Sequence, residues 1–276
     1  MISINCRGRL LSSDEPIVMG VINITPDSFY AGSRFLEFDK VEIQVERMIS
    51  QGASIIDIGA MSTRPGATHV DAKEEISRIL EPIKTVRKRF PDTFISLDTV
   101  SSKVAEVCLD EGVDIINDVS GGSMDPMLID VVAKHKAPYV LMHMLGTPEM
   151  MQDSPDYQDV VVEVLSFLKK KVYELEQKGI SELIIDPGFG FGKTLEHNYQ
   201  LLKQLNVFKI LDHPVLVGMS RKKMVQEVIS KDAQGALNGT TAVNMLALLN
   251  GASILRVHDV AEAAEAIAIY KQYSDA

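Results

Sequence analysis

Residues 51–59 read QGASIIDIG, in which Gly52 precedes a short apolar run that carries Asp57 near its end. Glycine at this point is typical of the residue that ends a helix, and the Ile-rich run is typical of a strand buried on both faces. The same order recurs at EGVDII (111–116), KGISELII (178–185) and NGASIL (250–255). The stretch therefore predicts a helix-to-strand junction that is repeated along the chain.

Eight such runs can be picked out, and those without a leading glycine follow a proline, which also stops a helix from continuing. The runs are IVMGVIN (17–23), SIIDIG (54–59), FISLD (94–98), DIINDV (114–119), YVLMH (139–143), LIID (183–186), VLVGM (215–219) and SILRV (253–257). Glycine and proline lead-ins alternate from one run to the next. Helical patterns lie between the runs, the longest over 159–177.

Eight alternating strand and helix units in 276 residues predict an α/β fold, a single (β/α)8 TIM barrel in one domain, 1–276. The alternating residues Ile2 to Cys6 predict a short N-terminal β-hairpin at the barrel bottom. Pro82, inside a helical pattern, predicts a kink or a restart of that helix.

The composition restricts the possible partners. The formal net charge is −10, with 38 acidic and 28 basic residues, which disfavours binding to nucleic acid or to an anionic membrane. The sequence has neither a signal-peptide pattern nor a long apolar run, so we expect a cytoplasmic protein. Cys6 and Cys108 are far apart, and we expect buried free thiols rather than a disulfide or a zinc site.

A barrel carries its site at the carboxyl ends of its strands, and polar residues end most of the runs. They are Asn23, Asp57 with Arg64 just beyond, Asp98, Asn117 with Asp118, His143, Asp186, Ser220 to Lys222, and Arg256 with His258. Asp57 comes one step early in its run, and we expect it to face the helices in a structural role. We interpret His143 as a packed strand-end histidine rather than a general base.

The ring divides by charge. Asp98, Asn117 and Asp186 offer acceptors suited to the amino-amide edge of a flat heterocycle, because a carboxylate can accept two N–H groups side by side. Basic side chains gather around the first, second and eighth runs, which are neighbours in a closed barrel. In a chain of charge −10 this cluster predicts a site for a multiply charged anion, pyrophosphate with a divalent ion.

Residues 186–194 read DPGFGFGKT, and the final Gly-Lys-Thr matches the end of a nucleotide-binding P-loop. The position that should be the first glycine is Pro187, which has no N–H to offer a phosphate. A dinucleotide fingerprint fails too, because these glycines are spaced by two. We therefore exclude both motifs and expect Lys193 to be a solvated residue at a helix start.

The ordered motifs resemble those of the bacterial dihydropteroate synthase family over nearly the whole chain. They are MGVINITPDSF (19–29), IDIGAMSTRPGA (56–67), SLDT (96–99), INDVSGG (116–122), LMHMLGTPEMMQ (141–152), IDPGFGFGKTLEHNYQLL (185–202), VGMSRK (217–222) and LRVHDV (255–260). The resemblance implies condensation of 7,8-dihydropterin-6-ylmethyl diphosphate with 4-aminobenzoate, a transferase reaction of folate synthesis that releases pyrophosphate. It also implies a homodimer with Mg²⁺ as cofactor.

The resemblance implies a role for each matching residue. The pterin would be bound by Asp98, Asn117, Asp186, Phe191 and Lys222, and the diphosphate by Asn23, Arg64, Arg256 and His258. The aminobenzoate pocket would comprise Phe29, Thr63, Pro65 and Ser220. Asn23 would also bind the metal. Catalysis would rest on Arg64, Lys222, Arg256 and His258, which stabilise the departing diphosphate.

The chain departs from the family pattern in two loops. Many members have an acidic residue after the PDSF motif and a glutamate before STRPG, where this chain has Tyr30-Ala31 and Met61. The first loop is therefore expected to close over the metal differently. We expect residues 24–35 and 61–72 to become ordered when substrates bind.

Two other functions fit the pterin-site residues. A methyltetrahydrofolate:corrinoid methyltransferase would need the pterin acceptors but no diphosphate cluster, so Arg64 and His258 argue against it. A non-catalytic pterin-binding barrel would not need the cations that stabilise a leaving group. We therefore favour the synthase.

Overall fold

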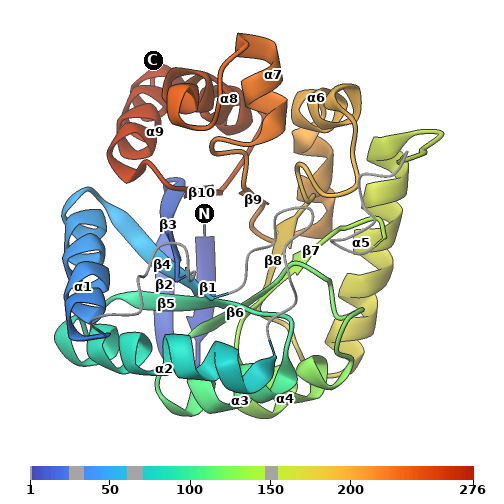
Figure 1. Ribbon diagram of the computed structural model, residues 1–276. Coiled ribbons are helices and arrows are strands. Elements are labelled where there is room, and N and C mark those ends of the chain that lie inside the picture. Colours follow the sequence, from blue (N-terminus) through green and yellow to red (C-terminus); the bar gives the residue numbers. More distant parts are fainter. Residues whose placement is uncertain (1, 25–33, 61–70, 147–154) are drawn as a thin grey trace.

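Eight parallel strands form a nearly closed barrel with helices on its outside (Figure 1). In this computed structural model, residues 2–24, 34–60, 71–146 and 155–276 are described. The barrel strands are β3 (Ile17–Asn23), β4 (Ala53–Gly59), β5 (Phe94–Asp98), β6 (Ile115–Asp118), β7 (Tyr139–Met142), β8 (Leu183–Asp186), β9 (Leu216–Val217) and β10 (Ile254–Val257). All eight predicted strands are present, and the barrel prediction is confirmed.

The hydrogen-bonded order is β8-β7-β6-β5-β4-β3-β10-β9, so β3 and β10 are neighbours. The ring closes between β8 and the short strand β9. There Ile185 forms an isolated parallel bridge to Val215 and donates its N–H to the Pro214 carbonyl at 2.9 Å. Because neighbouring strands are parallel, the carboxyl ends of all eight lie on one face.

The helices follow the strands in alternation. They are α1 (Arg34–Ser50), α2 (Ala72–Arg89), α3 (Ser102–Asp110), α4 (Met127–His135), α5 (Val160–Gln177), α6 (Leu195–Lys203), α7 (Lys223–Ile229), α8 (Leu237–Leu249) and α9 (Val260–Ser274), with 3₁₀ turns at Leu205–Leu211 and Gln234–Ala236. The glycines expected to end helices have positive φ, at Gly52, Gly112, Gly179 and Gly251. This left-handed conformation carries no steric penalty for glycine, which explains the lead-ins seen in the sequence.

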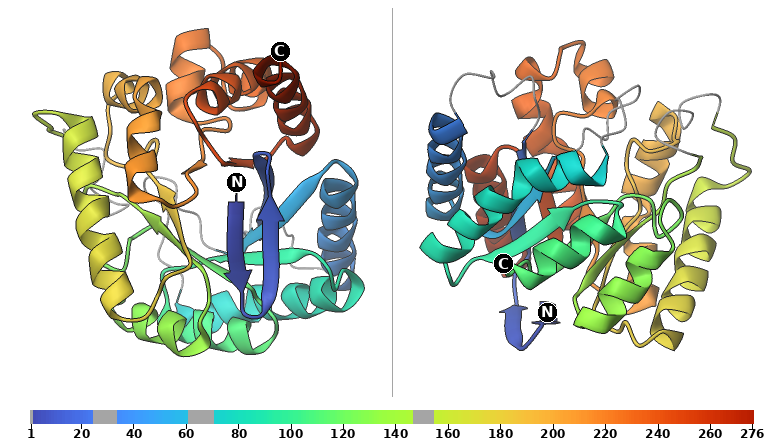
Figure 2. Two further views of the ribbon diagram at one scale, coloured as in Figure 1. Left: turned by 180° about the vertical axis from the view of Figure 1, so that it is seen from behind. Right: turned by 60° about the horizontal axis from the view of Figure 1, so that its bottom comes forward.

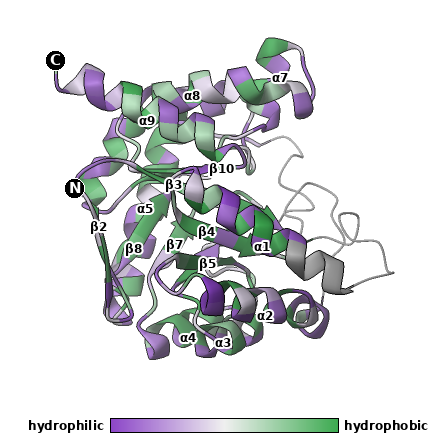
Figure 3. Ribbon diagram, turned by 90° about the vertical axis from the view of Figure 1, so that its left-hand side faces the viewer, coloured by the Kyte–Doolittle hydropathy of each residue, from purple (hydrophilic) through white to green (hydrophobic). Residues whose placement is uncertain are grey.

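The outward-facing side chains of the strands pack against the helices in one large core. Figure 3 shows apolar residues concentrated on the strands and polar ones on the exposed helix surfaces. Helix α2 continues through Pro82, so the predicted restart there is wrong. Pro82 is buried against this core, which holds the helix in place despite the missing N–H. Among the described residues, no helix is long and apolar enough to cross a membrane.

Strands β1 (Ile2–Cys6) and β2 (Arg9–Ser13) form the predicted antiparallel hairpin. It lies across the amino-terminal end of the barrel, as the view from behind in Figure 2 shows. Its buried side chains, among them Ile4 and Leu11, share a cluster with the first inward-facing residues of the strands. Those residues are Met19, Ile55, Ile115, Val140, Ile184, Leu216 and Ile254. The hairpin therefore closes the apolar bottom of the barrel. The free thiol of Cys6 lies in this cluster and that of Cys108 in the outer core, and both are buried as expected.

We predict that Ile4→Ala lowers the free energy of unfolding by about 2–5 kcal/mol, because Ile4 is 1% exposed and its removal leaves a cavity at the barrel bottom. Urea denaturation followed by circular dichroism measures the change. Leu10→Ala in the same hairpin is the control, since Leu10 is 64% exposed. Equal losses in the two variants would contradict the closing role of the hairpin.

Candidate active site

The polar ring is the second layer of inward-facing side chains in the barrel. Side chains alternate between the two faces of a strand, so a residue two positions beyond a lower-layer residue also faces inward. Four strands carry an isoleucine below and a polar residue above, in the pairs Ile55 and Asp57, Ile115 and Asn117, Ile184 and Asp186, and Ile254 and Arg256. The upper layer opens at the carboxyl ends of the strands, where barrel enzymes carry their active sites.

Arg256 lies at the centre of this layer. Its Nη2 lies 2.6 Å from Asp57 Oδ2 and 2.6 Å from Asp98 Oδ2, and its Nε donates to Asp57 Oδ2 at 2.7 Å. The side chain is 17% exposed and Asp57 is fully buried. The guanidinium thus joins β10 to β4 and β5.

Asp57 faces the barrel interior, so the expectation that it faces the helices is wrong. Its neighbours Ile56 and Ile58 face the helices instead. Asp57 Oδ2 also accepts a hydrogen bond from Asn117 Nδ2 at 3.1 Å. This contact uses the amide donor of Asn117 and leaves its carbonyl oxygen available as an acceptor.

The protonation of Asp98 depends on two opposing effects. Burial raises its pKa, while the ion pair with Arg256 lowers it, and the net result is a pKa of about 7. The negative charge of Asp57 adds to the upward shift. Gly59, the β4 residue paired with Asp98, leaves room for this carboxyl, because a Cβ there would lie 3.1 Å from Asp98 Cβ.

The charges of the buried Asp186 and the half-buried Lys222 interact at the end of β8. Burial raises the pKa of Asp186, and the charge of Lys222 opposes this shift. Burial lowers the pKa of Lys222 to about 8, and Asp186 opposes that shift in turn. Asp186 Oδ1 accepts the Gly188 N–H at 2.7 Å. In the described part of the chain, no donor forms a hydrogen bond with Oδ2, which is therefore available to a ligand.

Lys222 also fixes the loop that follows β8. Its Nζ donates to the Phe189 carbonyl at 2.6 Å and lies 4.5 Å from the centre of the Phe191 ring. Phe191 thus contributes an aromatic wall beside the two charges. A carboxylate, an ammonium and an aromatic ring lie together at the end of β8.

Comparison with known proteins shows the family of this chain. The family model described as "Pterin binding enzyme" matches residues 19–258. The dihydropteroate synthase of Haemophilus influenzae is 41% identical over 272 residues, which cover 98% of this chain and 98% of that protein. The chain belongs to the dihydropteroate synthase family. It is an enzyme of the transferase class.

Solved dihydropteroate synthase structures have the same fold. The Xanthomonas albilineans enzyme with 4-aminobenzoic acid has a TM-score of 0.91 at 38% identity, covering 99% of this chain and 98% of that one. The same enzyme in complex with 7,8-dihydropteroate has a TM-score of 0.88 at 35% identity, covering 99% of each chain. The family resemblance and the barrel prediction are thereby confirmed.

The remaining predicted residues of the dihydropteroate synthase site lie at the rim or outside the described ranges. Asn23 at the end of β3 and His258 after β10 are exposed, and these two strands are neighbours. The hydroxyl of Ser220 accepts the His258 N–H at 3.3 Å and ties two loops together. Outside the described residues lie Phe29, Thr63, Arg64 and Pro65, as do Tyr30, Ala31 and Met61.

Two polar residues of the ring face away from the barrel interior. Asp118 is buried behind β6, where it accepts the Tyr139 hydroxyl at 2.6 Å and the Gly122 N–H at 2.8 Å. Arg221 forms a bidentate ion pair with Asp259, at 2.8 Å for each contact. Both side chains stabilise loops at the barrel mouth.

Lys193 is buried, so the expectation of a solvated residue is wrong. It is 3% exposed, and its Nζ lies 3.0 Å from His143 Nδ1. Burial is the main cause that lowers the pKa of His143 to about 3, and this neutral ring also packs edge-on against Phe167. His143 therefore has the packed role that we expected. The helix start is provided by Thr194, whose hydroxyl accepts the His197 N–H at 3.2 Å.

Glu75 on α2 is a buried carboxyl that the sequence did not reveal. It is 1% exposed, and among the described residues neither carboxyl oxygen has a hydrogen-bond partner. Burial raises its pKa to about 7, although the nearby Thr99 hydroxyl and Arg78 favour the charged form. Its negative charge also contributes to the raised pKa of Asp98. Glu75 thus lies close behind the site.

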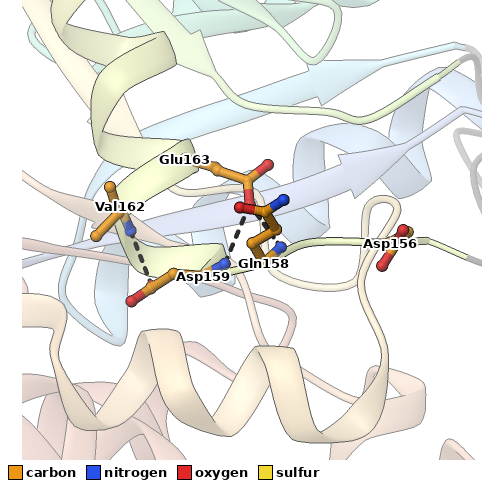
Figure 4. Close-up of a pocket in the computed structure, with 5 residues that line it drawn as sticks. All are labelled: Asp156, Gln158, Asp159, Val162 and Glu163. Carbon is orange, nitrogen blue, oxygen red and sulfur yellow. Dashed lines mark hydrogen bonds between the residues drawn. The ribbon is translucent and has the colours of Figure 1, made fainter.

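A separate cavity of about 400 Å³ lies at the start of α5 (Figure 4). Its lining is acidic, with Asp156, Asp159 and Glu163. Glu163 Oε1 accepts the N–H groups of Gln158 and Asp159 at 2.8 and 3.1 Å. Asp159 Oδ1 accepts that of Val162 at 3.1 Å. These bonds cap the helix, so two of the carboxylates already have partners, and the cavity is not part of the polar ring.

We predict that Glu75→Gln changes the pH dependence of stability. The carboxyl has a pKa near 4.5 in an unfolded chain and about 7 in the folded protein, so its favourable contribution is complete below pH 4.5 and is lost as the pH rises to about 7. Above pH 7 its ionisation costs at most about 3 kcal/mol. The variant should therefore melt at a higher temperature than the parent at pH 8, and the difference should disappear near pH 4.5.

Differential scanning calorimetry at the two pH values measures this difference. Glu81→Gln is the control on the same helix, because the Glu81 side chain is 63% exposed. A Glu75→Gln effect of the same size at both pH values would show that the carboxyl does not titrate as described.

Proposed function

We propose that the chain condenses 7,8-dihydropterin-6-ylmethyl diphosphate with 4-aminobenzoate to give 7,8-dihydropteroate and pyrophosphate. The observation that carries this proposal is the set at the barrel mouth in which Asp186, Lys222 and Phe191 lie together at the end of β8. The reaction is that of the family, and the relatives' complexes with 4-aminobenzoic acid and 7,8-dihydropteroate support it.

Pterin binding is assigned to Asp98, Asn117, Asp186, Phe191 and Lys222. The Asp186 carboxylate accepts the N–H groups of the amino-amide edge, and Oδ2 is available for this. The Asn117 carbonyl oxygen adds an acceptor, since Asp57 holds its amide nitrogen. Phe191 and the aliphatic part of Lys222 supply the apolar surface for the heterocycle.

The diphosphate is assigned to Asn23, Arg64, Arg256 and His258. In the described contacts Arg256 uses Nε and Nη2 for the two carboxylates, so Nη1 remains to donate to a phosphate oxygen. The exposed His258 lies one strand from Asn23, on the same side of the mouth. These donors stabilise the negative charge that develops as the diphosphate departs.

Magnesium is proposed as the cofactor, with the side-chain oxygen of Asn23 as its protein ligand. Among the described residues, no group of three or more His, Cys, Asp or Glu could hold a metal. A single oxygen ligand completed by substrate phosphates and water fits the usual binding of Mg²⁺. Bound there, the ion would neutralise charge on the leaving diphosphate.

The aminobenzoate pocket is assigned to Phe29, Thr63, Pro65 and Ser220. The amine of 4-aminobenzoate is largely neutral at pH 7 and is already a nucleophile, so no strong base is needed. The bond between the pterin methylene carbon and the diphosphate oxygen breaks, the amine nitrogen bonds to that carbon, and the resulting ammonium group loses one proton to solvent. Arg64, Lys222, Arg256 and His258 carry the catalytic role through charge.

A cytoplasmic homodimer remains part of the proposal. Exposed apolar side chains on the packed helices α8 and α9, such as Leu246, Leu249, Ile269 and Tyr273, support a surface of association. Sedimentation velocity at micromolar concentration measures the mass, and a monomer of 30.4 kDa would contradict the dimer.

We predict that the purified protein releases pyrophosphate only when the pterin diphosphate, 4-aminobenzoate and Mg²⁺ are all present. A coupled phosphate assay measures the release, with reactions that lack one component as controls. Release no faster than in a protein-free mixture would contradict the synthase function.

We predict that Asp186→Asn weakens pterin binding roughly 30- to 150-fold, because the loss of a charge-assisted hydrogen bond costs about 2–3 kcal/mol. Isothermal titration calorimetry with 6-hydroxymethylpterin measures the affinity. Asp156→Asn, in the acidic cavity at the start of α5, is the matched control and should bind as the parent does. Unchanged affinity in Asp186→Asn would remove Asp186 from the pterin site.

A further inference from the structure

The buried ammonium of Lys193 forms hydrogen bonds within the loop between β8 and α6. Its Nζ donates to the carbonyl oxygens of Gly188 at 2.9 Å and Phe191 at 3.0 Å. It also lies 3.0 Å from Nδ1 and 3.4 Å from the carbonyl oxygen of His143, at the end of β7. An ammonium has three N–H groups, so this one can hold the two loop carbonyls and the neighbouring strand at once.

The residues that Lys193 holds are adjacent to those that face the barrel mouth. The Gly188 N–H donates to Asp186, the Phe189 carbonyl accepts from Lys222, and the Phe191 ring lies beneath the Lys222 ammonium. Each of these contacts depends on the path of the backbone from 187 to 192. The two carbonyls bound by Lys193 lie at either end of the turn that contains Phe189.

The back of the loop is packed closely against the segment after β7. A Cβ on Gly188 would lie 1.9 Å from the His143 carbonyl oxygen, and one on Gly192 would lie 2.7 Å from that of Leu145. The Tyr157 hydroxyl donates to the Gly192 carbonyl at 2.9 Å. The loop therefore has a firm support on this side, and Lys193 connects it to that support.

Removal of the ammonium would leave the Phe191 carbonyl without its side-chain donor in a dry environment, and the Gly188 carbonyl would keep only the Phe191 N–H at 3.2 Å. An unsatisfied buried acceptor is unfavourable, so the loop would move to recover a hydrogen bond with water. Such a movement would shift the Asp186 carboxylate and Phe191 together. Burial lowers the pKa of Lys193 to about 7, because its amine is removed from solvent.

We propose that Lys193 is a positioning residue that holds the 187–192 loop in the conformation that binds the pterin, without contacting the pterin itself. The inference rests on the proposed pterin-binding function of Asp186 and Phe191. It gives a role to the lysine of the GKT sequence that resembles a P-loop, and that role involves no phosphate.

The test is Lys193→Met, which keeps most of the side-chain volume and removes the donors. We expect the Kd for 6-hydroxymethylpterin to rise roughly tenfold to a hundredfold, the range expected from one unsatisfied buried group. The KM for the pterin diphosphate should rise with it. Both are measured at a temperature where circular dichroism shows the variant folded, so that a loss of stability alone would leave Kd unchanged.

Lys203→Met on α6 is the matched control, because Lys203 is exposed, and it should bind as the parent does. Parent-like Kd in folded Lys193→Met would overturn the inference. If that variant does not fold, Lys193→Gln, which keeps a shorter donor, takes its place with the same expected rise, and parent-like affinity there would overturn the inference equally. Failure of the unaltered protein to bind the pterin would instead contradict the proposed function.

Discussion

The guanidinium of Arg256, held between the carboxylates of Asp57 and Asp98, is the interaction on which the barrel mouth depends. All three groups lie in the upper layer of a barrel whose lower layer is apolar. Charges in such a place are tolerated only when they have close partners, and loss of one partner from a buried pair typically costs about 3–5 kcal/mol. Arginine stays protonated, and its pairing with Asp57 and Asp98 links β10 to β4 and β5.

Acidic and basic groups lie close together in the wider set. The acidic groups include Asp57, Asp98 and Asp186, and the basic groups include Lys193, Lys222 and Arg256. Such groups offset one another's charge and still offer separate acceptors and donors to a ligand. The proposed reaction uses this separation, with the heterocycle on the side of β6 and β8 and the diphosphate on the side of β3 and β10.

The sequence predicted the eight strands well because parallel strands buried on both faces need continuous apolar runs, and glycine or proline marks the helix ends before them. It misplaced Asp57, because only the register of β4 shows that Asp57 and Gly59 face inward. It missed the burial of Lys193, since nothing in a local pattern shows that a polar loop folds back against the end of β7. It also missed the burial of Glu75, because this residue lies on a helix among other polar residues and no local pattern shows which of them faces the core.

The central claim is that the Asp186 carboxylate, beside Lys222 and Phe191, receives the amino-amide edge of a pterin at the carboxyl end of β8. A crystal structure of the protein soaked with 6-hydroxymethylpterin tests this most directly. We expect the heterocycle within hydrogen-bonding distance of Asp186 and Asn117, with the ion pairs of Arg256 intact. A pterin bound elsewhere, such as in the acidic cavity at the start of α5, would contradict it.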